Sequence, residues 1–349
     1  MKNAITLVVP GLFAAEPTAD VPLRAPALEF LLSRAEASEP ELAGADYYTR
    51  LLWLFGIRTQ PGEEAPVAAI SHLIDFDTGH EGFWIRADPV SLRPDLHRLV
   101  LYDAFPLEQQ QALALAQEVS TVLADQGWHI DIGRDVRRWY VRLDELPGLR
   151  THPPREALGR HVDPFLPQGP EAMRWHGIIN AIQMALHDCA VNRARERSGF
   201  LPINSVWFWG AGALPSPVSS SWIRLVSEEA FALGLAKLCQ CPISRGTGVG
   251  VSECFDDEGE VLVALSTELL QPNDVEAWKT LIETLDSDWV DPILRRLKAD
   301  RLNTVTLDTL DKVYRLSAAG MRRFWRRKRP LRAYLRPRSP QAQGISPIP

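Results

Sequence analysis

The sequence has few cysteines and methionines, and it has no long hydrophobic run. Its 349 residues include four Cys, four Met and six Tyr, against 27 Pro and 11 Trp. The cysteine spacing matches neither a redox CxxC motif nor a zinc site, so we expect buried free thiols in a reducing cytoplasm. No run reaches the roughly 18–20 apolar residues of a membrane-spanning helix. A disulfide miniprotein is therefore excluded, no membrane span is expected, and residues 5–9 predict a buried first strand rather than a signal peptide.

Motifs that would identify a reaction are also missing. The chain has no Walker loop, no HExxH pair, no GxSxG elbow and no EF-hand loop. The glycines of residues 246–250 alternate without the spacing of a dinucleotide-binding motif, so they predict an ordinary turn. The segment from Asp75 through Asp77 to His80 offers two carboxylates and an imidazole, which either hold a divalent ion or form a polar loop.

Acidic residues are scarce near the carboxyl end. Residues 294–338 hold 15 Lys and Arg but only three acids, a local charge of +12, which leaves −18 for the rest of a chain whose total is −6. This basic arm predicts a contact with an acidic partner protein or anion, with nucleic acid, with a membrane surface or with the acidic body of the chain itself. Nucleic acid is disfavoured, because a body this acidic repels a broad DNA footprint. The central cations of the arm are Arg322, Arg323, Arg326, Arg327, Lys328 and Arg329.

The apolar pattern predicts strands alternating with helices. Buried strands are predicted near residues 5–9, 83–87, 99–102, 129–132, 139–143, 205–209 and 261–265. Helices are predicted at residues 26–37, 40–55, 107–126, 170–197, 228–239 and 274–299, with loops at 60–67 and 144–170. This order predicts an α/β fold built from βαβ units, with a mostly parallel sheet flanked by helices.

The strand predicted at residues 205–209 carries a tryptophan pair. Trp207 and Trp209 lie two apart and therefore on one face of the strand. Asn204 precedes the strand, and Gly210 and Gly212 follow it. Since ligands bind at the carboxyl ends of strands in open α/β sheets, Asn204 and the glycine turn are candidate site residues. The tryptophans either belong to that site or pack in the core.

Several segments, taken in order, match a known pattern. Residues 186–195 read Leu-His-Asp-Cys-Ala-Val-Asn-Arg-Ala-Arg, and residues 203–205 and 207–212 read Ile-Asn-Ser and Trp-Phe-Trp-Gly-Ala-Gly. Together with residues 82–87, 131–142 and 151–169, these segments resemble archaeal-type cofactor-independent phosphoglycerate mutases, members of the alkaline-phosphatase-like superfamily. The resemblance implies a mutase-like core in residues 1–60 and 165–320, with an inserted α+β subdomain at 60–165. Residues 321–349 would then form the basic C-terminal arm, partly disordered.

A second resemblance extends over the whole chain. It rests on residues 84–90 (Trp-Ile-Arg-Ala-Asp-Pro-Val), 180–184 (Asn-Ala-Ile-Gln-Met), 204–210 (Asn-Ser-Val-Trp-Phe-Trp-Gly) and 323–327 (Arg-Phe-Trp-Arg-Arg). In these segments the chain is similar to the RpfE-type bacterial regulatory proteins, a group related to the mutases. This resemblance implies a regulatory role on a mutase-like scaffold.

The chain departs from the mutases at their metal ligands. Those enzymes are two-metal phosphotransferases whose first strand ends in Asp-Gly, and that Asp binds metal. Here the first strand ends Val9-Pro10-Gly11, and no His follows the strand at 261–265, where the mutases carry a second metal-binding segment. Two-metal catalysis needs several carboxylates and imidazoles to converge. The resemblance therefore implies a degenerate site, with no catalytic residue, no metal and no cofactor.

We therefore expect a non-catalytic regulatory or ligand-sensing protein that binds a small anionic ligand or an unidentified protein partner. The candidate ligand-binding residues are Arg86, Asp88, Asn192, Arg195, Asn204, Trp207, Trp209, Gly210 and Gly212. An active phosphotransferase is the alternative, and it would need a different metal set drawn from Asp75, Asp77, His80, Asp256 and Asp257. A nucleic-acid-binding regulator that uses the basic arm is a further alternative.

Overall fold

The chain forms two compact units. A computed structural model describes residues 3–13, 23–60, 62–95, 98–102, 106–245, 258–265, 275–323 and 325–335. Unit 1 comprises Met1–Arg58 and Pro217–Gln343, and unit 2 contains Thr59–Ser216. Unit 2 is thus inserted into the chain of unit 1. Its carboxyl-side boundary falls at Ser216 rather than near residue 165, because the helices and the strand of residues 172–213 pack with the inserted sheet.

Unit 1 is built on a seven-stranded, mostly parallel sheet. The strand order is β2 (Glu36–Ser38), β12 (Val313–Ser317), β11 (Thr304–Asp308), β1 (Ala4–Val8), β10 (Glu260–Ala264), β8 (Arg224–Val226) and β9 (Ile243–Ser244). The strands from β11 to β9 are parallel, whereas β12 pairs antiparallel with both β11 and the edge strand β2. The predicted fold class, a mostly parallel α/β sheet flanked by helices, is confirmed.

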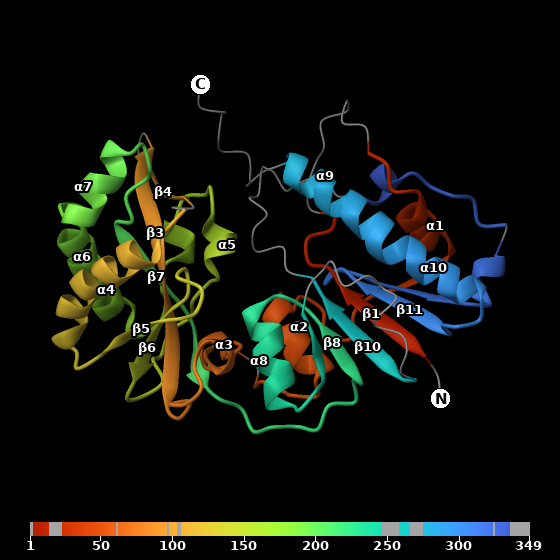
Figure 1. Ribbon diagram of the computed structural model, residues 1–349, viewed down its shortest axis with the longest axis horizontal. Coiled ribbons are helices and arrows are strands. Elements are labelled where there is room, and N and C mark those ends of the chain that lie inside the picture. Colours follow the sequence, from red (N-terminus) through yellow and green to blue (C-terminus); the bar gives the residue numbers. More distant parts are fainter. Residues whose placement is uncertain are drawn as a thin grey trace. The chain divides into compact units, whose positions relative to one another are not determined.

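Helices cover the sheet of unit 1 on both faces, so its central strands are buried throughout. Helices α1 (Pro26–Arg34), α9 (Val275–Thr284) and α10 (Asp291–Lys298) lie over β1, β10 and β11 (Figure 1) and share a core with Ile5 and Leu7. Val8, which points to the opposite face, is also fully buried. On the other side α2 (Tyr47–Leu54) packs with α8 (Ala230–Leu238), which contacts β8 and β9.

The helix predicted at residues 274–299 is interrupted by a wide turn. Between α9 and α10 lies the π-helical segment η2 (Leu285–Val290), which ends just before Pro292. A proline inside a helix lacks an N–H donor and clashes with the preceding turn, and a π-helical turn is one way to accommodate it. The apolar pattern could predict the helical segment but not this change of pitch.

Unit 2 contains a five-stranded sheet in which every pair is antiparallel. Its strands are β3 (Phe83–Asp95), β4 (Arg98–Tyr102), β5 (Ile130–Ile132), β6 (Trp139–Leu143) and β7 (Ser205–Ala213). The long β3 pairs with β6 and β7 through its first part and with β4 through its last residues. Residues 205–209 therefore lie in an antiparallel sheet, and not in the parallel sheet that the order of elements predicts. Their apolar run is explained by an antiparallel strand buried on both faces.

Helices flank the sheet of unit 2 as well. Helices α4 (Gln109–Ala124), α6 (Ala172–His187) and α7 (Ala190–Arg197) lie on one side of β3 and β7, and α3 (Val67–Asp75) lies on the other (Figure 1). The single helix predicted at 170–197 is divided at Cys189, whose extended backbone starts α7. The predicted loop at 144–170 holds a short helix α5 (Pro154–Ala157) and a 3-10 turn η1 (Asp163–Phe165).

The described part of the basic arm lies on its own unit. After the 3-10 turn η3 (Gly320–Arg322), Arg326 Nη1 donates to the carbonyl of Ala35 over 2.6 Å, and Lys328 Nζ lies 3.0 Å from Glu29. A last turn, η4 (Leu331–Tyr334), buries Leu331 against α1. Phe324 and residues 336–349, with the disorder expected there, lie outside the described residues.

Three of the four cysteines can be examined. Cys189, Cys239 and Cys241 are free and buried, as predicted, while Cys254 lies outside the described residues. Burial raises the pKa of the Cys239 and Cys241 thiols, so both stay protonated and unreactive at neutral pH. Among the described helices, none has both the length and the apolar character needed to cross a membrane.

Candidate functional site

One face of the unit 2 sheet gathers the charged candidates. Arg86 and Asp88 on β3 alternate with residues that point to the other face, so both side chains lie on the α3 side. On β7 the register shifts by one residue between the partners of Trp84 and Arg86, and Gly210 there adopts a φ of +64°. This β-bulge places Trp209 opposite Arg86 and aims both toward the same face.

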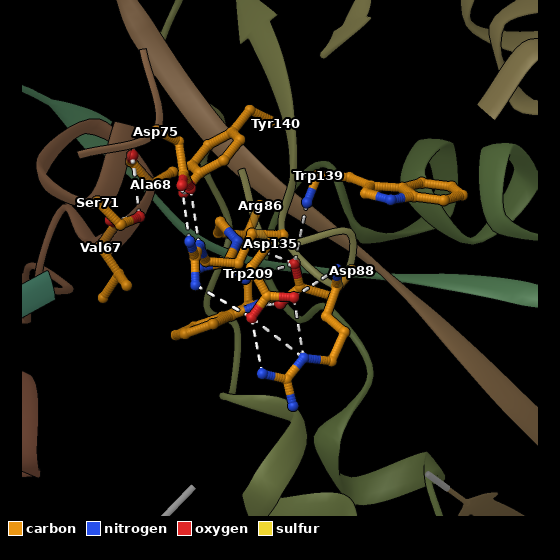
Figure 2. Close-up of polar contacts among 12 residues, drawn as sticks. Val67, Ala68, Ser71, Asp75, Arg86, Asp88, Asp135, Trp139, Tyr140 and Trp209 are labelled. Carbon is orange, nitrogen blue, oxygen red and sulfur yellow. Dashed lines mark hydrogen bonds and ion pairs between the residues drawn. The ribbon is translucent and has the colours of Figure 1, made fainter. Parts of the chain in front are cut away.

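Arg86 and Asp88 form a buried ion pair (Figure 2). Arg86 Nη2 lies 2.7 Å and Nε 2.8 Å from Asp88 Oδ1, and Trp209 Nε1 donates to Asp88 Oδ2 over 2.7 Å. The guanidinium also lies over the rings of Tyr140 and Trp209, with centroids 5.2 and 5.3 Å away. Burial raises the pKa of Asp88, while Arg86 and the indole N–H favour its ionised form. The carboxylate has a partner on both oxygens.

A second carboxylate, Asp75 at the end of α3, is paired in the same way. Arg138 donates to both of its oxygens, over 2.7 Å from Nε and 2.6 Å from Nη2, and the Tyr140 hydroxyl donates over 2.6 Å. Burial opposes ionisation, but the hydrogen bonds from Arg138 and Tyr140 prevail and lower the pKa of Asp75. The pKa of Tyr140 is raised, first by burial and then by the adjacent carboxylate.

The residues proposed as an alternative metal set have other partners. Asp77 forms an ion pair with Arg134 at 3.2 Å, and His80 Nδ1 lies 3.0 Å from His72 Nδ1. Among the described residues, no group of three acidic, imidazole or thiol side chains is placed to hold an ion. Asp256 and Asp257 lie outside those residues. Asp75, Asp77 and His80 therefore do not fit a metal site.

Gly210 and Gly212 allow β7 to pack closely against the start of α3. A methyl group at Gly212 would lie 2.5 Å from Pro66 Cβ, and one at Gly210 would lie 2.8 Å from Val67 Cβ. Thr151 links β7 to Glu64, because its hydroxyl accepts from Gly210 N over 3.1 Å and donates to the Glu64 carboxylate over 2.6 Å. These two glycines let the start of α3 lie against β7, which brings Asp75 to the site.

Three candidates lie elsewhere in unit 2 and bind backbone groups. Asn192 donates to the carbonyls of Leu186 and Ile203 and accepts from Ile203 N. Asn204 accepts from the N–H of Leu92 on β3 and donates to the carbonyl of the same residue, each over 2.8 Å. Arg195 is 1% exposed and donates to two carbonyls and to the Gln111 side chain. In this fold their polar groups hold loops and strand ends together.

The structure thus brings together Arg86, Asp88 and Trp209 from the predicted set, and places Trp207 beside them. Trp207 Nε1 donates to the carbonyl of His152 over 2.7 Å, so it is tied to a neighbouring loop. Sequence reasoning missed Tyr140 and Arg138. Arg138 directly precedes β6 and Tyr140 lies on it; their spacing of two was the available signal, but it does not tell which face meets α3.

The carboxyl edge of the parallel sheet in unit 1 is the second place to consider, because open α/β sheets bind ligands there. Pro10 follows β1 and offers no side-chain ligand. On the neighbouring β11, Asp308 lies 3.3 Å from Arg50 Nε, and their side chains are 5% and 2% exposed. A cation therefore already faces the acid that ends the strand next to β1.

No family model matches the chain. It is 25% identical over 222 residues to a probable 2,3-bisphosphoglycerate-independent phosphoglycerate mutase of Geobacter sulfurreducens. The aligned region covers 60% of this chain and 53% of that protein. It is 28% identical over 252 residues to the 2,3-bisphosphoglycerate-independent phosphoglycerate mutase of Methanosarcina acetivorans. That aligned region covers 62% of each chain. The chain thus matches less than two thirds of the length of these relatives.

A solved structure shares the fold. The PH0037 protein of Pyrococcus horikoshii superposes with a TM-score of 0.54 and 13% identity, over 90% of this chain and 87% of that one. At this identity the likeness concerns the fold alone. Taken with the sequence matches, the mostly parallel sheet and the inserted unit show that the chain is homologous to the cofactor-independent phosphoglycerate mutases and has their alkaline-phosphatase-like fold.

Proposed function

We propose that this chain is a non-catalytic regulatory or ligand-sensing protein on a phosphoglycerate-mutase-like scaffold, as the RpfE-type resemblance implies. The observation that carries the proposal is the pairing of the candidate carboxylates with arginines. Asp75 is held by Arg138, and Asp308 faces Arg50. These acids are neutralised within the protein.

The pairing opposes metal binding for an electrostatic reason. A divalent ion needs carboxylates whose oxygens point into an open site, and it repels a guanidinium at hydrogen-bond distance. Binding at Asp75 would require Arg138 and Tyr140 to release both oxygens. Removing the partner of a buried charge costs about 3–5 kcal/mol, which an incoming ion would have to offset. The described residues do not fit the metals that the mutases use.

The ligand that we propose for this chain is a small anion. At the site the side chains of Arg134, Arg137 and Arg138 are 58%, 41% and 21% exposed, and they form ion pairs with Asp77, Asp135 and Asp75. Arginine forks suit carboxylate and phosphate. The described part of the basic arm contacts α1 and β2, which supports a regulatory contact over broad nucleic-acid binding.

A turnover assay tests the proposal. The full-length chain is assayed for phosphoglycerate mutase and phosphomonoesterase activity with Mg²⁺, Mn²⁺ or Zn²⁺ added in turn. We expect no rate above that of a preparation carrying Asp75→Asn. Metal-dependent turnover that this variant abolishes would instead support the phosphotransferase alternative.

A further inference from the structure

Unit 1 contains a cavity of about 970 Å³ beside the turn that joins β11 to β12. Its walls come from the carboxyl-terminal end of α1, from that turn and from residues 325–335 of the arm. The volume is in the range of sites that hold a small organic ligand. The turn follows β11 at the carboxyl edge of the parallel strands.

Aromatic rings form one wall of the cavity. Phe13, Tyr314 and Tyr334 contact one another, with ring centroids 6.1, 6.3 and 6.4 Å apart. Phe13 and Tyr314 are buried, whereas Trp325 on the same cavity is 67% exposed. The cavity is thus lined by several aromatic rings, and aromatic rings are surfaces on which a flat ring can stack.

Positively charged side chains also line the cavity. Arg326, Arg327, Arg329 and Lys312 line the cavity together with a single acid, Asp311. Arg326 and Lys312 are engaged with Ala35 and Glu39. The guanidinium groups of Arg327 and Arg329 form no ion pair with any described residue. The backbone N–H of Arg329 donates to Ser33 over 2.9 Å, which fixes this stretch of the arm to α1.

We propose that this cavity binds a nucleotide, with its base against the aromatic wall and its phosphates on Arg327 and Arg329. Rings and arginines that form no ion pair with a described residue, in one cavity, match a ligand that joins a flat ring to a multiple negative charge. Because the chain has no Walker loop, side-chain guanidinium groups would hold the phosphates instead of loop N–H groups. Nucleotide binding in this cavity is separate from the proposed non-catalytic role and does not depend on it.

Calorimetric titration of the full-length chain tests the proposal. The probes are ATP, GTP, CTP and UTP, with adenosine and inorganic tripolyphosphate as half-ligands. We expect at least one nucleotide to bind on the order of tenfold more tightly than either half-ligand, with an affinity that falls as salt is added. Failure of all four nucleotides to bind up to about 1 mM would overturn the proposal. Tripolyphosphate that binds as tightly as the best nucleotide would overturn the role of the aromatic wall.

A pair of charge-reversal variants locates the site. Arg327→Glu with Arg329→Glu should weaken nucleotide binding by about tenfold or more. The matched control is Lys298→Glu with Arg301→Glu, which makes the same charge change at exposed positions of unit 1 outside the cavity and should leave the affinity unchanged. Equal unfolding temperatures show that both proteins fold. Equal losses in the two variants would place binding elsewhere.

Discussion

Asp88 is a buried carboxylate that is held by one guanidinium and one indole N–H. Asp88→Asn keeps the shape of the side chain but leaves the guanidinium of Arg86 without its countercharge. Since an unpaired buried charge is costly, we expect the free energy of unfolding to fall by about 3–5 kcal/mol. Urea denaturation at neutral pH measures this loss.

Asp77→Asn is the matched control, because the ion pair of Asp77 with Arg134 is exposed. The expected loss there is at most about 1 kcal/mol. Losses of similar size in the two variants would show that the Arg86–Asp88 pair contributes no more than a surface pair.

His72 makes stability depend on pH. Burial lowers its pKa to about 4, His80 acts in the same direction, and Asp75 opposes both. The unfolded chain binds this proton near pH 6.5, so it takes up protons first as the pH falls. His72 therefore contributes stability above about pH 6.5 that is lost progressively down to about pH 4.

His72→Phe removes this titration and keeps a ring against Phe76 and Trp84. Between pH 7 and about pH 4, we expect the wild type to lose on the order of a few kcal/mol more than the variant. Urea unfolding of both proteins at the two pH values measures the difference. His187→Phe, at an exposed position on α6, should follow the wild type. Parallel profiles for wild type and His72→Phe would contradict the assignment.

At the scale of elements, α3 depends on its approach to β7. Gly212→Ala would place a methyl group 2.9 Å from Pro66 Cα and 2.5 Å from Pro66 Cβ, so backbone must move. We expect a loss of about 1–3 kcal/mol in unfolding free energy and weaker near-UV circular dichroism from the site tryptophans.

Gly177→Ala is the control for this variant. Gly177 lies within α6, and a methyl group there meets nothing within 4 Å. Alanine in a helix interior should raise stability by about 0.5–1 kcal/mol. A Gly212→Ala protein as stable as the wild type would show that α3 can shift without cost.

The strands of unit 2 could be predicted from the sequence, and so could β1 and β10 of unit 1, because runs such as residues 5–9 and 261–265 are apolar and β-branched. The other five strands of unit 1 were not predicted. Among them, β11 and β12 were missed although Val305, Leu307, Tyr314 and Leu316 alternate with more exposed residues, because each strand offers only two buried apolar side chains in five residues. Helix α3 was missed because it is short and follows a loop rich in proline.

The site could be predicted only in part. Arg86, Asp88 and Trp209 were selected by the resemblance and do converge. Their contact depends on the bulge at Gly210, which sets the register of β7 against β3. Register across strands far apart in sequence follows from packing of whole elements, and a local pattern does not contain it.

At the scale of the whole molecule, ion pairs between basic and acidic residues attach the arm to its own unit. The carboxylates of Glu29 and Glu36 on and beside α1 face Lys328 and Arg323. The net charge of −6 therefore describes the molecule poorly, since a basic segment lies on an acidic surface of its own unit. The arm also supplies Arg327 and Arg329, which line the cavity and form no ion pair with any described residue.

The most direct test of the proposed loss of catalysis counts metal ions. The full-length chain is equilibrated with Mn²⁺ or Zn²⁺, passed through a desalting column, and its metal content is measured by plasma mass spectrometry, with Asp75→Asn and Asp308→Asn as controls. A non-catalytic chain whose acids are paired with arginines should retain well below about one ion per chain, the same as both variants. Retention of about two ions per chain, lost in either variant, would contradict the proposal.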